Sequence, residues 1–199
     1  MEKRMACQRC GFTHQCICPQ IPALESSVNI ALLTHENELK RDTNTGKLLQ
    51  QTLPNCQSYV WQRKSAPAEL MAMIQEDTVQ ALLLFPSEQS VDVSEMTEVY
   101  PVENQKLLFI VLDGTWQEAK KMMNKSQWLQ TIPQVHLTPS LDSAYTLRRN
   151  QDSGHLCTCE VGSLLLNQLG ETEQAQALNQ YFHHYLKVFQ ADKSGHALK

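Results

Sequence analysis

A series of short apolar runs, each followed by a polar cluster, most strongly constrains the fold of this chain. The clearest run, LLFIVL at 107–112, stops at Asp113 and precedes a polar segment with helical spacing. Continuous apolar runs of this length are typical of strands buried on both faces of a parallel sheet. Further strands are predicted at 28–33, 57–61, 78–85 and 134–137.

Helical patterns lie between and after these runs, and a regular strand–helix alternation predicts an α/β fold with a mostly parallel sheet flanked by helices. Five helices are predicted: one that ends near Leu53, one at 66–75, one after Asp113, one that ends at Gly170 and one at 172–190. In the last helix an apolar stripe recurs at three- and four-residue spacing, which indicates core packing. Residues 89–105 are polar and are expected to be irregular.

The polar clusters are expected to meet at one edge of the sheet, because the carboxyl ends of parallel strands lie together and ligands bind beyond them. They cover residues 34–45, 62–64, 86–88, 113–116 and 148–160. Asp113 and Thr115 are therefore candidate functional residues, although either could simply cap a helix. Trp116 shares a helical face with Ala119 and Met123, which favours core packing over a nucleobase platform.

The chain is expected to have three parts: an N-terminal cysteine motif and linker (1–27), a main domain (28–190) and a disordered tail (191–199). No apolar run reaches the length of a membrane span and the N-terminus is polar, so we expect a cytoplasmic protein. With a net charge of −4, nucleic-acid binding would need a local basic patch. Candidates for such a patch are Lys40, Arg41, Lys47, Arg63, Lys64, Lys120, Lys121 and Lys125.

Four of the seven cysteines lie close together near the N-terminus, as Cys7, Cys10, Cys16 and Cys18. Thiolates within a short loop suit a structural, four-coordinate zinc ion. The second pair is closer together than is usual, and His14 could replace one ligand. An iron–sulfur cluster and four free thiols are the alternatives.

Several common active sites find little support. The chain has no GxGxxG and no GxxxxGK[ST] motif, and Ser87 is not in a GxSxG motif. Cys157 and Cys159 lie near His155, but buried, inert cysteines are the more common case. Carboxylates at the predicted edge suit a cationic ligand, and the Arg148–Arg149 pair suits a carboxylate or phosphate.

The segment Asp113-Gly114-Thr115-Trp116, followed by Ala119-Lys120-Lys121-Met122, resembles the signature of the DTW-domain family. Other segments resemble family motifs in the same order: the four cysteines, Thr43-Asn44-Thr45-Gly46, Phe85-Pro86-Ser87, Tyr145-Thr146-Leu147-Arg148 and Thr158-x-Glu160. Together they extend from residue 7 to about residue 162.

The resemblance implies a tRNA-uridine aminocarboxypropyltransferase, which moves the 3-amino-3-carboxypropyl group of S-adenosylmethionine to N3 of a tRNA uridine and releases 5′-methylthioadenosine. It also implies a SPOUT-like fold with a knotted C-terminal region and a structural zinc ion. The uridine position stays open. The oligomeric state also stays open, with a monomer favoured.

By the same resemblance, the catalytic residues are Asp113, Thr115 and Trp116, with Asp113 as the base that takes the N3 proton. S-adenosylmethionine is expected to contact Phe85, Pro86, Ser87, Glu88, Leu112, Asp113, Arg148, Cys157, Thr158 and Glu160. The tRNA is expected to contact His35, Arg41, Asn44, Thr45, Arg63, Lys64, Lys120 and Arg149. The alternatives are a non-catalytic zinc-containing RNA-binding module and an RNA methyltransferase dependent on S-adenosylmethionine.

Overall fold

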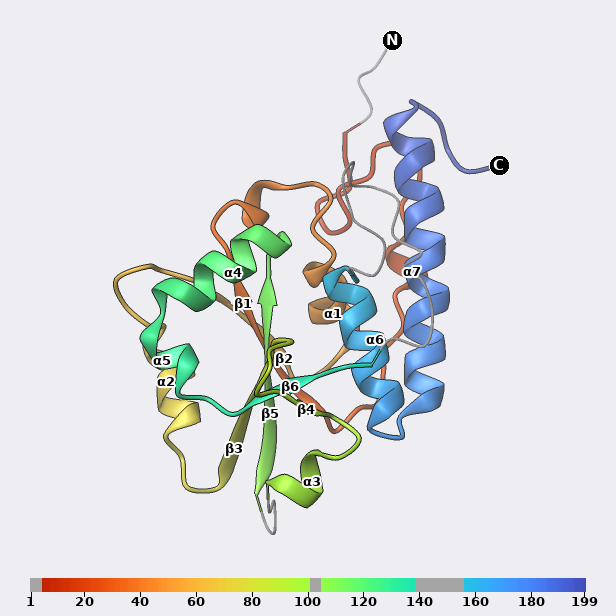
Figure 1. Cartoon of the computed structure of the whole chain (residues 1–199). Helices are drawn as coiled ribbons and strands as arrows, with labels where there is room; N and C mark the ends of the chain where they lie inside the picture. The colour runs from red at the N-terminus through yellow and green to blue at the C-terminus, as the bar shows by residue number, and fades with distance from the viewer. Residues whose placement is uncertain (1–4, 101–104, 139–155) are drawn as a thin grey trace.

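A parallel sheet forms the centre of the computed structural model, which describes residues 5–100, 105–138 and 156–199 (Figure 1). The strands of the described residues are β1 (Asn29–Thr34), β2 (Cys56–Val60), β3 (Val79–Leu84), β4 (Val91–Asp92), β5 (Lys106–Asp113) and β6 (Gln134–His136). They are arranged in the order β2-β1-β5-β3-β6-β4, and each neighbouring pair is parallel. The predicted α/β class with a mostly parallel sheet is confirmed.

The helices cover both faces of this sheet. They are α1 (Gly46–Thr52), α2 (Ala68–Ile74), α3 (Met96–Val99), α4 (Trp116–Lys125), α5 (Gln127–Gln130), α6 (Thr158–Gln168) and α7 (Thr172–Lys193), with short 3-10 turns at Cys18–Gln20 and Glu38–Lys40. Alternate strand residues point to opposite faces. Ile30 and Leu32 therefore pack in the same core as α1, α6 and α7, whereas Ala31 and Leu33 pack with α2, α4 and α5.

Two predictions about local structure are wrong. Residues 89–105 were expected to be irregular, but they contain β4 and α3, whose Met96 is buried. The tail expected from residue 191 begins as helix, since α7 continues to Lys193. The backbone N–H of Leu198 also donates to Gln15, so this segment is held by contacts that sequence periodicity does not reveal.

The N-terminal cysteine motif packs against the end of α7 (Figure 1). The Phe12 ring lies 5.5 Å from Tyr185 and 6.2 Å from Phe189, measured between ring centroids. The Asp192 carboxylate accepts hydrogen bonds from the backbone N–H groups of Thr13 and His14, at 2.8 and 2.7 Å. The motif is therefore fixed to the main domain by both apolar and polar contacts.

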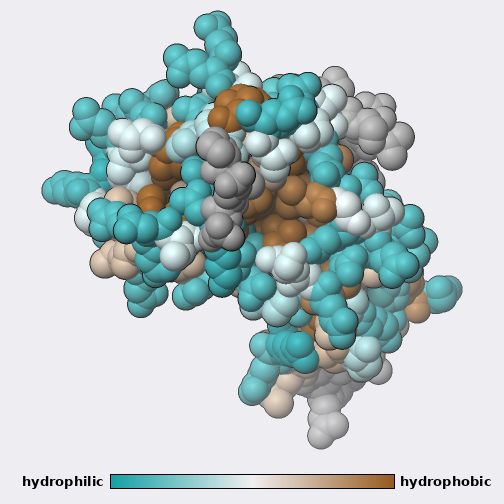
Figure 2. Space-filling model, turned by 90° about the horizontal axis from the view of Figure 1, so that it is seen from below, coloured by the Kyte–Doolittle hydropathy of each residue, from teal (hydrophilic) through white to brown (hydrophobic). Residues whose placement is uncertain are grey.

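Figure 2 shows the side of the molecule where the strands begin, with hydrophobic residues near the centre and a mainly hydrophilic rim. No helix in the described ranges is both long and apolar enough to cross a membrane. The predicted functional edge lies at the opposite end of the strands.

Candidate active site at the carboxyl ends of the strands

Strand register brings Asp113 to the edge of the sheet beside the end of β1. Thr34, the last residue of β1, pairs with Asp113, the last residue of β5. The backbone N–H of His35 then donates to the Asp113 carbonyl at 2.9 Å. Because the two central strands end together, the loops that follow them share one site.

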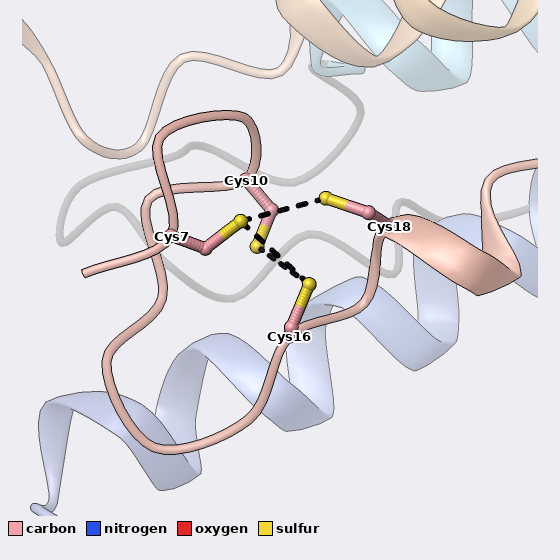
Figure 3. Close-up of side chains that lie close together, drawn as sticks. All are labelled: Cys7, Cys10, Cys16 and Cys18. Carbon is pink, nitrogen blue, oxygen red and sulfur yellow. Dashed lines mark hydrogen bonds between the residues drawn. The ribbon is translucent and has the colours of Figure 1, made fainter. Parts of the chain in front are cut away.

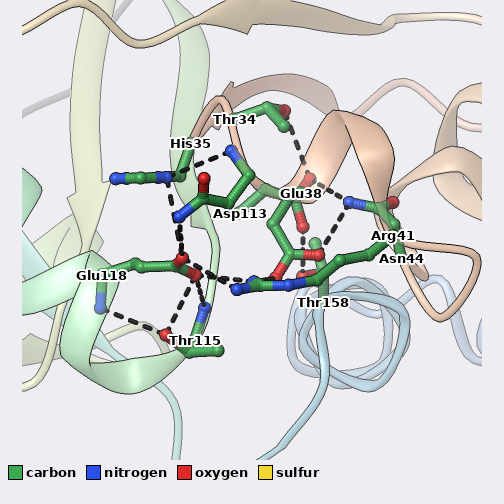
Figure 4. A network of polar contacts seen from close by, with 10 residues as sticks. Thr34, His35, Glu38, Arg41, Asn44, Asp113, Thr115, Glu118 and Thr158 are labelled. Carbon is green, nitrogen blue, oxygen red and sulfur yellow. Dashed lines mark hydrogen bonds and ion pairs between the residues drawn. The ribbon is translucent and has the colours of Figure 1, made fainter.

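The Asp113 side chain is only 3% exposed, and hydroxyl and amide groups from three elements hold it (Figure 4). Oδ1 accepts from Thr158 Oγ1 at 2.7 Å. Oδ2 accepts from Asn44 Nδ2 at 2.8 Å and from Thr34 Oγ1 at 3.2 Å. Burial raises the pKa of the Asp113 carboxyl above its ordinary value, although these hydrogen bonds oppose the rise. A carboxylate with a raised pKa is a stronger base, so Asp113 is suited to accepting a proton.

Gly46, at the start of α1, allows the helix to approach this carboxylate closely. A Cβ atom at Gly46 would lie 2.8 Å from Asp113 Oδ2 and 2.9 Å from Cγ. Real Cβ atoms essentially never make such short contacts. The absence of a side chain at residue 46 therefore allows the Asp113 carboxylate to lie where its hydrogen bonds hold it.

A second charged cluster, built on Arg41, lies beside Asp113 (Figure 4). Arg41 donates to both carboxylate oxygens of Glu118, at 2.7 and 2.9 Å, and also to Glu38, which is 1% exposed. Burial opposes ionisation of Glu118, but hydrogen bonds from Arg41, Asn37 and Thr115 hold its pKa well below the ordinary value. The cluster therefore holds the loop after β1 against the start of α4.

Thr115, rather than Asp113, caps α4. Its hydroxyl oxygen accepts from the Glu118 N–H at 3.2 Å, and the Glu118 carboxylate accepts from the Thr115 N–H at 2.8 Å, which completes a capping box. The capping role considered for both residues thus applies to Thr115, and Asp113 remains the buried carboxylate of the site.

Two cavities lie around Asp113. The first, of about 340 Å³, is mostly apolar and is formed by the ends of β3, β5 and β6 and the start of α6, including Phe85, Leu112, Gly114 and Thr158. The second, of about 300 Å³, is polar and is lined by Asp113 itself and by residues of the loop after β1. Both volumes fall in the range of small-ligand sites.

Trp116 lies at the apolar cavity instead of in the core, so the core-packing prediction for it is wrong. Its ring is stacked on Phe85 at 5.5 Å, with Lys120 Nζ 5.1 Å from the ring centroid. Ala119 and Met123 on the same helix are buried. Trp116 is the first residue of α4, so it extends past the sheet and forms part of the cavity wall.

The residues expected to contact S-adenosylmethionine are only partly brought together. The apolar cavity is lined by four of them: Phe85, Pro86, Leu112 and Thr158. Ser87 and Glu88 are exposed beyond the end of β3. Glu160 accepts from the Cys157 N–H at 2.8 Å and so caps α6. Arg148, like the rest of 139–155, lies outside the described residues.

The two cysteines near this cavity, buried Cys159 and half-buried Cys157, are poorly suited to act as nucleophiles. Burial raises the pKa of the Cys159 thiol well above its usual value and also raises that of Cys157. A raised thiol pKa disfavours the thiolate that a nucleophile needs. His155, the base considered for them, lies outside the described residues.

The residues expected to contact tRNA divide into two groups. Exposed side chains are found at Arg63, Lys64 and Lys120, and Arg41 is partly exposed. Buried positions are found at His35, Asn44 and Thr45, which therefore support the site from inside. The His35 ring is stacked on Trp61 at 5.3 Å, and its Nε2 has no hydrogen-bond partner among the described residues. Arg149 lies outside the described part of the chain.

The four N-terminal cysteines form a site that could hold a metal ion (Figure 3). Their Sγ atoms all lie within 4.8 Å of one another. The Cys7–Cys16, Cys7–Cys18 and Cys10–Cys16 sulfur distances are 3.6, 3.7 and 3.9 Å. Zn–S bonds of about 2.3 Å in a tetrahedron place sulfurs about 3.8 Å apart, so the cluster fits zinc. The His14 ring contacts Asp192 at 3.1 Å, so His14 supports the motif from outside the cluster.

Several residues of the site were given no role from the sequence, although Thr34 and Glu38 fall within the predicted polar cluster 34–45. Thr34, Glu38 and Glu118 hold Asp113 or Arg41 directly, and His136 lines the apolar cavity. A threonine followed three residues later by a glutamate, as at Thr115 and Glu118, is the signature of a capping box. This spacing could have identified Glu118 as a residue that holds the start of the helix. For Glu38 no local pattern distinguishes a buried carboxylate from a solvated one.

The chain matches the DTW domain over residues 4–190. It is 29% identical over 174 residues to tRNA-uridine aminocarboxypropyltransferase 2 of Mus musculus, covering 84% of this chain and 57% of that protein. The protein of the same name from Drosophila melanogaster is 30% identical over 172 residues, covering 82% of this chain and 66% of the relative. The chain is 26% identical over 138 residues to tRNA-uridine aminocarboxypropyltransferase A of Arabidopsis thaliana, covering 63% of this chain and 52% of that protein.

These alignments span about three-fifths of the length of the mouse and fly relatives. No solved structure matches the chain. Since the DTW match extends over most of the 199 residues and includes every described residue of the Asp113 site, the chain belongs to the DTW-domain family.

Proposed function

We propose that this protein transfers the 3-amino-3-carboxypropyl group of S-adenosylmethionine to N3 of a uridine in tRNA. The observation that carries the proposal is the buried Asp113 carboxylate, held between an apolar and a polar cavity in a chain of this family. The names of the relatives support tRNA uridine as the substrate.

The apolar cavity suits the donor. S-adenosylmethionine carries an aromatic base and a sulfonium cation but no phosphate, so a phosphate-binding glycine loop is not needed. Phe85 and Trp116 offer aromatic surface for the adenine base of the donor. In this proposal, Glu88 or Glu160 binds the ammonium group of S-adenosylmethionine. Arg148 binds its carboxylate.

Asp113 acts as the base. Its carboxylate takes the N3 proton of the uridine, the N3 electron pair forms a bond to the methylene next to sulfur, and the carbon–sulfur bond breaks. The bonding electrons go to sulfur, which becomes the neutral thioether of 5′-methylthioadenosine. Thr34, Asn44 and Thr158 orient the carboxylate throughout.

The four-cysteine motif holds a structural zinc ion in this proposal, because all four ligands come from the protein and leave no position for a substrate. Exposed Arg63, Lys64 and Lys120 contact the tRNA backbone. A SPOUT-like knot in the C-terminal region, the division into an N-terminal cysteine motif with its linker (1–27) and a main domain from residue 28, a cytoplasmic location and a monomeric state belong to the same proposal.

One assay tests the reaction. The protein is incubated with S-adenosylmethionine and unmodified tRNA, and the small product is identified. 5′-Methylthioadenosine is expected; S-adenosylhomocysteine would instead indicate methylation, and neither product would indicate a binding module. Asp113→Asn should lose transfer but retain S-adenosylmethionine binding, with exposed Asp77→Asn as the matched control. Wild-type turnover by Asp113→Asn would refute the assignment of the base.

A further inference from the structure

A second buried carboxylate, that of Glu38 in the loop after β1, lies beside Asp113 (Figure 4). Asn44 Nδ2 lies 2.8 Å from Asp113 Oδ2 and 3.3 Å from Glu38 Oε2. An amide nitrogen carries two hydrogens, so Asn44 can donate one to each carboxylate. Because both oxygens are within hydrogen-bond distance of the same atom, the two negative charges are close enough to interact.

The first turn of α1 fixes the orientation of the shared Asn44 amide. The backbone N–H of Lys47 donates to Asn44 Oδ1 at 3.1 Å. A backbone N–H can only donate, so this end of the amide is the oxygen and the other end is the nitrogen. The Asn44 side chain is therefore held from its oxygen end, while its nitrogen end connects Glu38 to Asp113.

Arg41 does not cancel the charge of Glu38. Its guanidinium donates to Glu38 and also to both carboxylate oxygens of Glu118, at 2.7 and 2.9 Å. One positive charge thus faces two carboxylates, and the cluster keeps a net negative charge beside Asp113.

Other charges near the site are bound to one another. Lys47 Nζ donates to the Asp42 carbonyl at 3.2 Å, and the Asp42 carboxylate pairs with Lys193 at 2.7 Å. Charged or titratable side chains are also found on the other elements that pack around Asp113, namely His35 and Lys40 after β1, Cys56 in β2 and Glu160 in α6. Glu38 differs from all of these because it takes one of the two hydrogens of the Asn44 amide.

A negative charge at this position favours proton transfer to Asp113. When Asp113 accepts a proton it loses its own negative charge, so its repulsion from Glu38 is relieved. Burial raises the pKa of the Asp113 carboxyl, and the charge of Glu38 raises it further. A base with a higher pKa takes a proton more readily.

We propose that Glu38 is a positioning residue of the transfer reaction: it orients the Asp113 carboxylate through the shared Asn44 amide, and its negative charge makes Asp113 a stronger base. This inference rests on the proposed function. Glu38 acts through Asp113 and not on the reacting atoms. If Glu38 only anchored Arg41, its loss would instead resemble the loss of Glu118, the other carboxylate bound to Arg41.

Glu38→Gln tests this by removing the charge while keeping the size of the side chain. Glu118→Gln is the matched control, because it also removes a carboxylate from Arg41 but leaves both carboxylates on Asn44. Glu36→Gln, at an exposed position of the same loop, should behave like the wild type. Circular dichroism establishes that each variant is folded. Glu38→Met, which removes the charge without placing a second amide against Asn44, replaces Glu38→Gln if that variant does not fold.

Two titrations are measured for each variant. One follows single-turnover transfer against pH, and the other follows the Asp113 carboxyl carbon by NMR, with the signal identified by its absence from Asp113→Asn. In Glu38→Gln both should move to lower pH by about one unit, the lower end of the effect of a nearby charge. The limiting rate should fall by roughly 3- to 10-fold, because a weaker base reacts more slowly. Glu118→Gln should move both titrations less than half as far.

Equal shifts in Glu38→Gln and Glu118→Gln would overturn the inference, since Glu38 would then act only as a partner of Arg41. Unshifted titrations in Glu38→Gln would also overturn it, even if the rate fell. The NMR titration separates this inference from the proposed function. If the wild-type protein releases no 5′-methylthioadenosine, the proposed function fails, whereas a shifted Asp113 signal would still identify Glu38 as the group that sets the basicity of Asp113.

Discussion

Gly46→Ala provides a sharp test of the site because two general effects oppose each other there. In a helix this substitution usually stabilises by roughly 0.5–1 kcal/mol, since alanine loses less conformational entropy on folding. Here the new Cβ would lie 2.8 Å from Asp113 Oδ2. Overpacking of this kind costs about 1–3 kcal/mol. We therefore expect a net loss of about 0–2 kcal/mol in the free energy of unfolding.

The effect on turnover should be much larger than the effect on stability. Restoring an ordinary contact requires the Asp113 carboxylate to move by about 0.5 Å, which stretches its bonds from Asn44 and Thr158 beyond about 3.2 Å. A displaced base should slow transfer by roughly 10- to 100-fold. S-adenosylmethionine affinity should change little, because Gly46 lines the polar cavity.

Gly162→Ala is the control for this comparison. Its Cβ would also overlap a neighbour, Leu49 Cδ2 at 2.5 Å, but the neighbour is the end of a flexible side chain away from the carboxylate. Urea denaturation and single-turnover transfer, measured on both variants, separate the two effects. If Gly46→Ala transfers as fast as Gly162→Ala, the close approach to Asp113 has no role in catalysis.

Three other measurements address separate parts of the molecule. Transfer should fall as pH decreases through a pKa above the ordinary Asp value of about 3.9, because the base must be ionised and burial raises the Asp113 pKa; a rate that stays constant down to about pH 4 would contradict this. Glu118→Gln should lower the free energy of unfolding by about 2 kcal/mol at pH 7. Since the folded-state pKa of Glu118 is lowered, its contribution is present above the unfolded value of about 4.3 and lost below it, so the difference from wild type should shrink in acid; a difference independent of pH would refute this. Cys16→Ser should abolish the bound zinc found by mass spectrometry and lower Tm, whereas Cys56→Ser should retain the metal; iron with visible absorbance would point to a cluster instead.

The long apolar runs could be placed from sequence because each one is buried on both faces. The observed ends of β1 and β5 therefore differ from the predicted ends by only one residue. β4 has only two residues, so no alternating or continuous apolar pattern marks it. The end of α7 was missed because its last turn is held by contacts with the distant N-terminal motif, such as those of Asp192.

The site was predictable only as far as strand ends and motifs could define it. Asp113 could be predicted as a site residue because it comes directly after a buried apolar run. Glu38 and Arg41 lie in a polar loop, and their pairing with Glu118 depends on how two loops meet across the sheet. Trp116 had the right spacing for a buried stripe, but spacing does not reveal where the helix extends past its sheet.

The strand order also has a consequence for how the protein folds. β1 pairs with β5 in the centre of the sheet, and the partner residues Thr34 and Asp113 are 79 positions apart in the chain. During synthesis, the edge of β1 that pairs with β5 therefore stays unpaired until β2, β3 and β4 have been made. Long-range pairing of this kind slows folding and exposes strand edges to aggregation. We expect chains truncated before β5 to need chaperones.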